Sequence, residues 1–132
     1  MGSVVERRAH VVNHEGAPRR GDIWMVDLSH PVGVEAAFRR PAVVVSNNAA
    51  NESASSLGRG VVTVVPVATN VSRIYSFQVG LAAEVGGLRR ESKVQAEQVR
   101  AVAIERLRER VGRVPSRSMN EVDAALRLHL SL

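Results

Sequence analysis

The chain has 132 residues, of which 45% are apolar, and a formal net charge of +5 at pH 7, which is the size of one domain with room for a hydrophobic core. It has no cysteine, which excludes disulfide frameworks, thiolate metal sites and cysteine nucleophiles. With no apolar run near the roughly 18 residues of a membrane span and no signal-peptide pattern, we expect a cytoplasmic protein that does not enter a membrane.

The positive charge is carried almost entirely by arginine, with Lys93 as the sole lysine. The planar guanidinium fork matches phosphate oxygens, and net positive charge favours encounter with nucleic acid or an acidic protein. A GC-rich genome would give the same arginine excess, so composition alone leaves both explanations open. Aromatic residues are only 3% of the chain, which argues against a base-stacking platform.

The first half of the chain predicts three strands. Residues 1–18 lack periodicity, and we expect them to be a flexible extension before a domain that spans 19–132. Alternating or continuous apolar runs are typical of half-buried and fully buried strands, and they occupy residues 23–28, 42–46 and 61–67. The polar segments 29–38 and 47–59 are expected to be loops, the second with room for a short helical turn.

The second half predicts further short strands and one good helix. Strands are expected over 76–81, within 92–102 as one or two pieces, and over 111–114, with a short helix at 104–108. After Pro115, the Ser118 and Glu121 pair forms a capping-box pattern. Val122, Leu126 and Leu130 follow at helical spacing, so residues 118–131 are predicted to form an amphipathic C-terminal helix.

These elements favour a mainly β protein with short helices. Five to seven short strands are expected, and strands and helices do not alternate regularly. A strongly bent, mostly antiparallel sheet or small barrel is therefore predicted rather than a doubly wound sheet.

Metal and cofactor chemistry find no support in the sequence. The histidines are scattered and no His-Glu-x-x-His pattern occurs, so neither a metal site nor a cofactor is expected. No P-loop or Gly-x-Ser-x-Gly motif is present. His129 is expected to be a surface or core residue of the last helix. The remaining arginine, hydroxyl, amide and carboxylate groups suit metal-free RNA cleavage, in which the ribose 2′-OH serves as nucleophile.

Arg39, Arg40 and Pro41 lead directly into a valine-rich strand that ends on Ser46 and Asn47. This layout places a guanidinium at the edge of a sheet, where it would stabilise a phosphate. The alternative is an exposed cation that only covers the sheet edge.

Four blocks in this order closely resemble the MazF/PemK toxins of bacterial toxin–antitoxin systems. The resemblance extends from about residue 19 to the C-terminus, and its blocks are residues 20–24, 40–47, 62–67 and 92–100.

The resemblance implies an α+β fold of the SH3-like, CcdB/PemK barrel type with a C-terminal amphipathic helix. It implies a homodimeric, metal-independent, sequence-specific endoribonuclease. The substrate would be single-stranded RNA, not DNA, and attack by the 2′-OH would leave a 2′,3′-cyclic phosphate and a 5′-OH. The expected protein partner is a cognate MazE-like antitoxin with an extended acidic segment.

The resemblance also assigns the catalytic residues. Arg40 matches the family's catalytic arginine. The family's catalytic threonine aligns without a gap to Ala68, and Thr69 is one residue later. A shift of one residue turns a strand side chain to the opposite face, unless the strand ends or bulges after Pro66. Thr69 is kept as a catalytic candidate on that condition. Glu35 matches a loop carboxylate that could assist proton transfer, with a solvated side chain as the alternative.

Six further residues are predicted to contact RNA. They are Arg39, Ser46, Asn47, Gln95, Glu97 and Gln98. Asn47 could instead cap the following turn. If the alternation of a strand persists, Gln95 and Glu97 face the same side and line a groove together; a buried structural network is the alternative.

Two other functions remain open. The alanine at position 68 suggests a catalytically weakened homologue that acts as an RNA- or antitoxin-binding module. A gyrase inhibitor of the CcdB type would share the fold but not the four sequence blocks.

Overall fold

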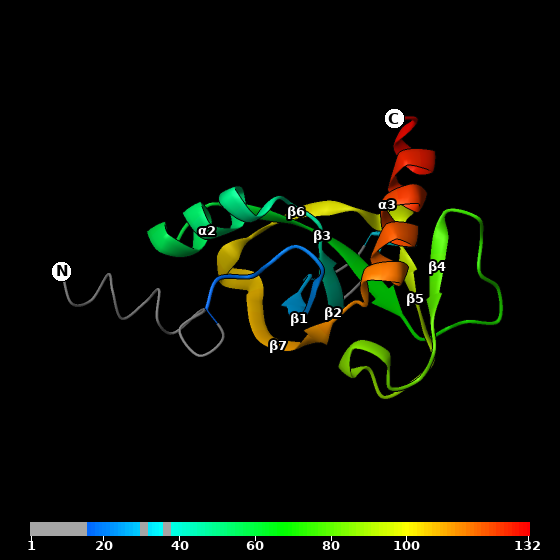
Figure 1. Ribbon diagram of the computed structural model, residues 1–132. Coiled ribbons are helices and arrows are strands. Elements are labelled where there is room, and N and C mark those ends of the chain that lie inside the picture. Colours follow the sequence, from blue (N-terminus) through cyan, green and yellow to red (C-terminus); the bar gives the residue numbers. More distant parts are fainter. Residues whose placement is uncertain (1–15, 30–31, 36–37) are drawn as a thin grey trace.

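The computed structural model describes residues 16–29, 32–35 and 38–132, and its centre is one bent sheet of seven strands (Figure 1). The order is β4-β5-β3-β2-β1-β7, β6 pairs with β3, and every pairing is antiparallel. This confirms the predicted fold class. The strands are β1 (Asp22–Asp27), β2 (Arg39–Val44), β3 (Val61–Ala68), β4 (Gln78–Leu81), β5 (Ser92–Gln95), β6 (Arg100–Ala103) and β7 (Leu107–Arg113).

Strand β3 joins the two halves of the sheet. Its start pairs with β6, its end pairs with β5, and β2 lies along its other edge. Because successive strand residues point to opposite faces, β3 feeds two hydrophobic clusters. Val65 and Val67 belong to a cluster completed by α3, whereas Val62 and Val64 belong to one completed by α2. The two helices lie at opposite ends of the sheet (Figure 1).

Helix α2 (Asn48–Leu57) occupies most of the segment predicted to be a loop. Asn47 caps its first turn by accepting from the Ala50 amide, and Gly58 ends it in the left-handed conformation, as helix termini prefer. Its buried residues are Asn51, Ala54 and Ser55, all small or polar. The segment therefore lacks the large apolar residues at helical spacing that would have marked it as a helix.

Helix α3 (Ser116–Leu130) begins two residues before the predicted start. Its N-cap is Pro115, and no side chain bonds the cap, so the predicted capping box of Ser118 and Glu121 is wrong. Proline suits this position because its missing N–H would be unpaired in any case. Val122 and Ala125 are buried and fix the helix on the sheet.

Two 3-10 turns interrupt the chain between β5 and β7. β5 and β6 are separated by the 3-10 turn η2 (Ala96–Gln98), and another turn, η3 (Ile104–Arg106), follows β6. The predicted helix over 104–108 is therefore only that single turn, and β7 is longer than the predicted strand over 111–114. Ile104 and Leu107 are both buried, and this turn-to-strand transition places both side chains in the core.

The predicted extension of residues 1–18 lies outside the described residues except for 16–18, of which Pro18 is buried. Neither α2 nor α3 has the length and apolar character that crossing a bilayer requires, and these are the α-helices of the described residues.

Candidate functional site

Arg40 lies at the beginning of β2, at the edge of a surface hollow of about 350 Å³. Ala42 pairs with Pro66 on β3; continuing this register by two residues places Arg40 opposite Ala68. Residues paired across antiparallel strands point to the same face. The Arg40 hollow, as we call it, is lined by Arg39, Arg40, Pro41, Val67, Ala68, Thr69 and Asn70.

Thr69 lines the Arg40 hollow although strand alternation assigns it to the opposite face. Strand β3 ends at Ala68, and Thr69 is exposed outside the ladder. The strand thus continues two residues past Pro66 in regular pairing, and Thr69 is the first residue beyond it. The structure brings Arg40 and Thr69 to one hollow; their chemical roles remain predictions.

A second hollow of about 130 Å³ adjoins the first, because Pro41, Val67 and Thr69 line both. We call it the Arg89 hollow. Its other lining residues are Leu88, Arg89, Arg90 and Ser92. Sequence reasoning missed these arginines, which lie in the connection between β4 and β5, and they are brought to Thr69 only by the fold.

Two buried polar side chains anchor the loop that leads from Thr69 to β4. The Lys93 ammonium donates to the Arg73 carbonyl oxygen at 2.8 Å, and the Gln78 Oε1 accepts from the Tyr75 amide at 3.1 Å. Lys93 also pairs with Ala68 across β5 and β3. The only sequence signal for Lys93 was a lone lysine beside a valine in a predicted strand, and it did not indicate a loop anchor.

Glu35, Glu97 and Gln98 meet at a different hollow of about 620 Å³, whose lining does not include Arg40. The Gln98 Nε2 donates to the Val34 carbonyl oxygen at 3.1 Å, which ties η2 to the segment before β2. The Glu35 carboxylate accepts from the Val32 amide at 2.7 Å and is exposed. The structure therefore brings Glu35, Glu97 and Gln98 together at a hollow that is separate from the Arg40 hollow.

Glu97 is also part of a buried polar network. Its Oε2 accepts from the Gln78 Nε2 at 2.8 Å, whereas its Oε1 and the Gln95 Oε1 are buried without a partner among the described residues. A buried acceptor without a donor costs about 1–3 kcal/mol. Residues 96–98 form a turn rather than a strand, so the expected alternation does not hold and Gln95 does not line the Glu97 hollow.

Ser46 and Asn47 lie at the far end of β2 from Arg40, and their side chains serve the fold. The Ser46 hydroxyl donates to the Asn51 Oδ1 and accepts from the Thr63 amide. The Asn47 Oδ1 accepts from the Ala50 amide at 2.8 Å. The structure therefore does not bring these two residues together with Arg40, and their predicted RNA contact stays a prediction.

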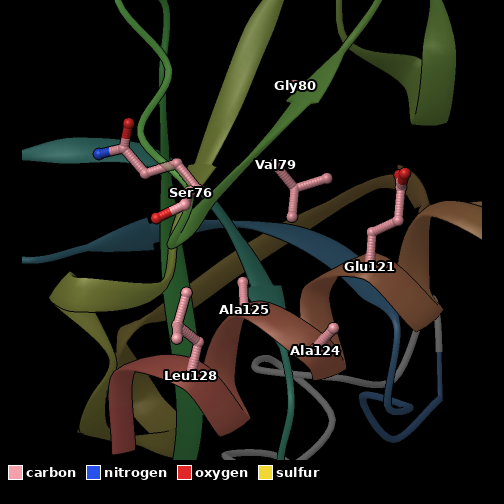
Figure 2. Close-up of a pocket in the computed structure, with 8 residues that line it drawn as sticks. Ser76, Val79, Gly80, Glu121, Ala124, Ala125 and Leu128 are labelled. Carbon is pink, nitrogen blue, oxygen red and sulfur yellow. The ribbon is translucent and has the colours of Figure 1, made fainter.

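The two arginine hollows differ in charge from the other hollows of the described chain. The residues that line them include four arginines and no carboxylate. The groove between β4 and α3 has Glu121 at one end and Leu128 at the other (Figure 2), and the hollow at the end of α3 is lined by Asp123. Positive charge without a carboxylate among the lining residues favours anions.

One carboxylate near the start of β2 has an altered acidity. The Ser29 amide donates to the Asp27 carboxylate at 3.1 Å, and this bond, helped by Arg108, holds the pKa of Asp27 below its ordinary value. In the register of β1 and β2, Asp27 lies opposite Arg39, next to Arg40 in the chain.

Within the described ranges, no three histidine, aspartate or glutamate side chains converge as metal ligands would. His129 is exposed on α3, with its ring centroid 6.5 Å from that of Phe77. This agrees with its expected place on the helix surface.

Comparison with known proteins gives consistent matches. The family model described as "PemK-like, MazF-like toxin of type II toxin-antitoxin system" matches residues 19–130. Endoribonuclease MazF9 of Mycobacterium tuberculosis (strain H37Rv) is 54% identical over 114 residues, which cover 86% of this chain and 97% of that protein. A crystal structure of MazF from Deinococcus radiodurans is similar at 25% identity, with a TM-score of 0.71 and coverage of 89% and 100%. A mycobacterial endoribonuclease in complex with its cognate antitoxin is similar at 26% identity, with a TM-score of 0.70 and coverage of 88% and 97%.

Proposed function

Because the chain belongs to the PemK-like, MazF-like toxins of type II toxin–antitoxin systems, it is an endoribonuclease, and we propose that it cleaves single-stranded RNA at Arg40 and Thr69. The observation that carries this assignment is the Arg40 hollow, where both side chains meet and no carboxylate is among the lining residues. A phosphodiester is the RNA group that such a hollow favours.

In the proposed reaction the ribose 2′-oxygen attacks phosphorus and the bond to the 5′-oxygen breaks. The 2′-OH gives up one proton to a base and the leaving 5′-oxygen takes up one proton from solvent, so the products are a 2′,3′-cyclic phosphate and a 5′-OH end. Arg40 binds the phosphate and stabilises the charge that builds up on its oxygens, as a fixed cation does in a transition state. The Thr69 hydroxyl donates to a phosphate oxygen and orients the group for in-line attack. No metal or cofactor takes part in these steps.

A base must accept the 2′-OH proton, and we propose that Glu35 or Glu97 takes this role, which requires the RNA-bound protein to bring one of these carboxylates to the Arg40 hollow. Both line one hollow, and Glu35 precedes Arg39 by four residues in the chain. Glu35 is the more accessible of the two because it is exposed, whereas the Glu97 Oε1 is buried and its Oε2 accepts from Gln78. Arg39, Gln95 and Gln98 are proposed to contact the flanking RNA.

The family also suggests the partners. We propose a homodimer that a MazE-like antitoxin inhibits, since a similar mycobacterial endoribonuclease has been solved with its cognate antitoxin. A cytoplasmic location is proposed because RNA and antitoxin would both be met there.

Cleavage of a single-stranded RNA in EDTA tests the proposal. We expect wild-type protein to produce 5′-OH ends, and Arg40→Ala to lower kcat by about 10²–10³-fold, the loss typical of removing one transition-state donor. Arg59→Ala, an exposed arginine before β3, is the matched control and should keep full activity. Cleavage by Arg40→Ala at the wild-type rate would contradict the assignment.

A second candidate function rests on Ala68, which stands at the family's threonine position and offers no hydroxyl. In this alternative the protein binds RNA or antitoxin and cleaves weakly. It predicts that wild-type protein and Arg40→Ala show the same low cleavage while RNA binding is retained only by the wild type.

A further inference from the structure

Arg89 and Arg90 are presented by a short segment that is held rigidly at both ends. Leu88, on one side, is buried in the cluster beneath α3; its amide donates to the Val85 carbonyl at 3.2 Å and its carbonyl accepts from the Glu84 amide at 2.7 Å. Ser92, on the other side, is only 2% exposed. The two arginines between these anchors are exposed, so the fold aims them outward from a fixed backbone.

The turn itself is closed by a side chain. The Ser92 hydroxyl donates to the Arg90 carbonyl oxygen at 2.8 Å, which fixes the backbone immediately before β5. Because Ser92 begins the strand that pairs with β3, the position of Arg90 relative to Thr69 is set by sheet register rather than by a free loop. This rigidity lowers the entropy that a ligand must overcome to order the two side chains.

Arg89 and Arg90 form no ion pair with the described part of the protein. Glu91 follows them in the chain but lines neither arginine hollow. By contrast, Arg110 and Arg113 both pair with the buried Asp22 and serve the fold.

The Arg89 hollow and the Arg40 hollow are neighbours, since Pro41, Val67 and Thr69 line both. A single strand of RNA carries a negative charge at every nucleotide. A strand whose scissile phosphate lies at Arg40 and Thr69 therefore brings a neighbouring phosphate along the surface, and the arginines on the other side of Thr69 are placed to meet it.

We propose that Arg89 and Arg90 form a second phosphate-binding subsite, which holds the phosphodiester next to the scissile one. The inference rests on the proposed function, because it takes RNA as the ligand. The subsite is independent of base identity, so it contributes affinity and positions the strand without reading its sequence. Arg89 and Arg90 do not take part in bond cleavage, which remains at Arg40.

The test measures how RNA binding depends on salt. A fluorescent oligonucleotide carries the mapped cleavage sequence with a 2′-deoxyribose at the cleaved position, so that no attack occurs. For single strands, each phosphate contact contributes about 0.7 to the slope of log affinity against log salt. We expect the double variant Arg89→Gln, Arg90→Gln to reduce the slope by about 0.7, the value for one phosphate, and to bind about tenfold more weakly at low salt. Its kcat at saturating RNA should stay at the wild-type value.

The matched control is the double variant Arg59→Gln, Arg127→Gln, which removes the same charge at two exposed positions outside both arginine hollows. It should keep the wild-type slope. Equal slopes for the two double variants would overturn the subsite, because the effect would then be one of net charge only. If wild-type protein binds but leaves the all-ribose oligonucleotide intact, the proposed function fails, while the slopes still decide whether the subsite exists.

Discussion

The two ends of the central strand pair β2 and β3 use their polar groups in opposite ways. At the end that leads into α2, Ser46 bonds both Asn51 and the Thr63 amide, and Asn51 is fully buried. At the other end, Arg40 and Thr69 border an open hollow. Polar groups satisfied by the protein itself build the fold, whereas those that face an open surface in a fixed frame are available to a ligand.

This comparison explains why polar residues of one sequence block have different roles, one in binding and one in the fold. Arg40 and Ser46 belong to the same block and to the same strand region, but the Ser46 hydroxyl has one hydrogen to donate and Asn51 accepts it. The sequence block alone does not distinguish a residue that stabilises the protein from one that meets a substrate. Helix α2, which follows the block, makes that distinction by supplying the partner.

The largest expected effect is on stability, at the end of β2 that leads into α2. Asn51→Ala removes the acceptor of the Ser46 hydroxyl and the donor to the Ser46 carbonyl, and leaves both groups of the half-buried Ser46 without these partners. We expect the free energy of unfolding to fall by about 2–3 kcal/mol, measured by urea denaturation. Glu52→Ala, at an exposed position of the same helix, should change it by less than about 0.5 kcal/mol.

The same Asn51→Ala variant should cleave RNA with unchanged kcat and KM at a temperature where it is folded. A loss of cleavage by folded protein would show that the satisfied end also contacts substrate, and the contrast between the two ends would not hold.

The next effect concerns the open end and the hydroxyl at Thr69. Thr69→Ala should lower kcat about tenfold, less than the 10²–10³ typical of a preorganised oxyanion donor, because Thr69 is exposed. The double variant Ala68→Thr, Thr69→Ala moves the hydroxyl to the residue opposite Arg40 and should restore cleavage. Single-turnover kinetics with saturating enzyme separate this effect on chemistry from one on binding. A double variant as slow as Thr69→Ala would show that position 68 does not reach the phosphate.

Lys93 tests whether the open end depends on a buried anchor. Lys93→Met removes the ammonium that holds the Arg73 carbonyl and keeps an unbranched apolar stem. We expect kcat to fall about fivefold, a fraction of the 10²-fold that a misplacement of about 1 Å can cost. The melting temperature should stay constant or rise, because replacing a buried charge with an apolar side chain is often neutral or stabilising.

Hydrogen exchange of the amides in residues 69–77 gives a readout of the Lys93 anchor that does not depend on cleavage. It should quicken in Lys93→Met and recover in Lys93→Arg. If both the exchange rates and kcat are unchanged in Lys93→Met, Lys93 does not anchor the loop that follows Thr69.

The sequence predicted the parts of the molecule that follow from local periodicity. The valines of β3 alternate between two cores, and such a run is recognisable without knowing its partners. Helix α2 was missed because Asn51 and Ser55 are buried through hydrogen bonds and small size, which hydrophobic patterns do not register. The pair of Asn47 and Gly58 at its ends was the available signal.

For the site, the resemblance identified Arg40, and the end of β3 decided that Thr69 lies in the same hollow. The contributions of Lys93, Gln78 and the Arg89 segment depend on contacts between residues distant in the chain. These contacts form only when the strands pair in the correct register, so a local sequence pattern does not predict them. Residues whose role depends on such long-range contacts are the hardest to predict from sequence.

The smallest expected effect lies beside the open end, at Asp27. Its pKa is held below the ordinary value by the Ser29 amide and Arg108, so the folded state favours the charged form. A group of this kind stabilises the protein above its unfolded pKa of about 3.8, and the stabilisation is lost as the pH falls through the lower folded value. Asp27→Asn removes the titration, so the melting temperatures of variant and wild type should differ slightly at pH 7 and converge below about pH 4. Because the carboxylate is exposed to solvent, the difference in melting temperature at pH 7 should shrink in 0.5 M salt. A difference in melting temperature that persists at low pH would mean that Asp27 acts through packing rather than through its charge.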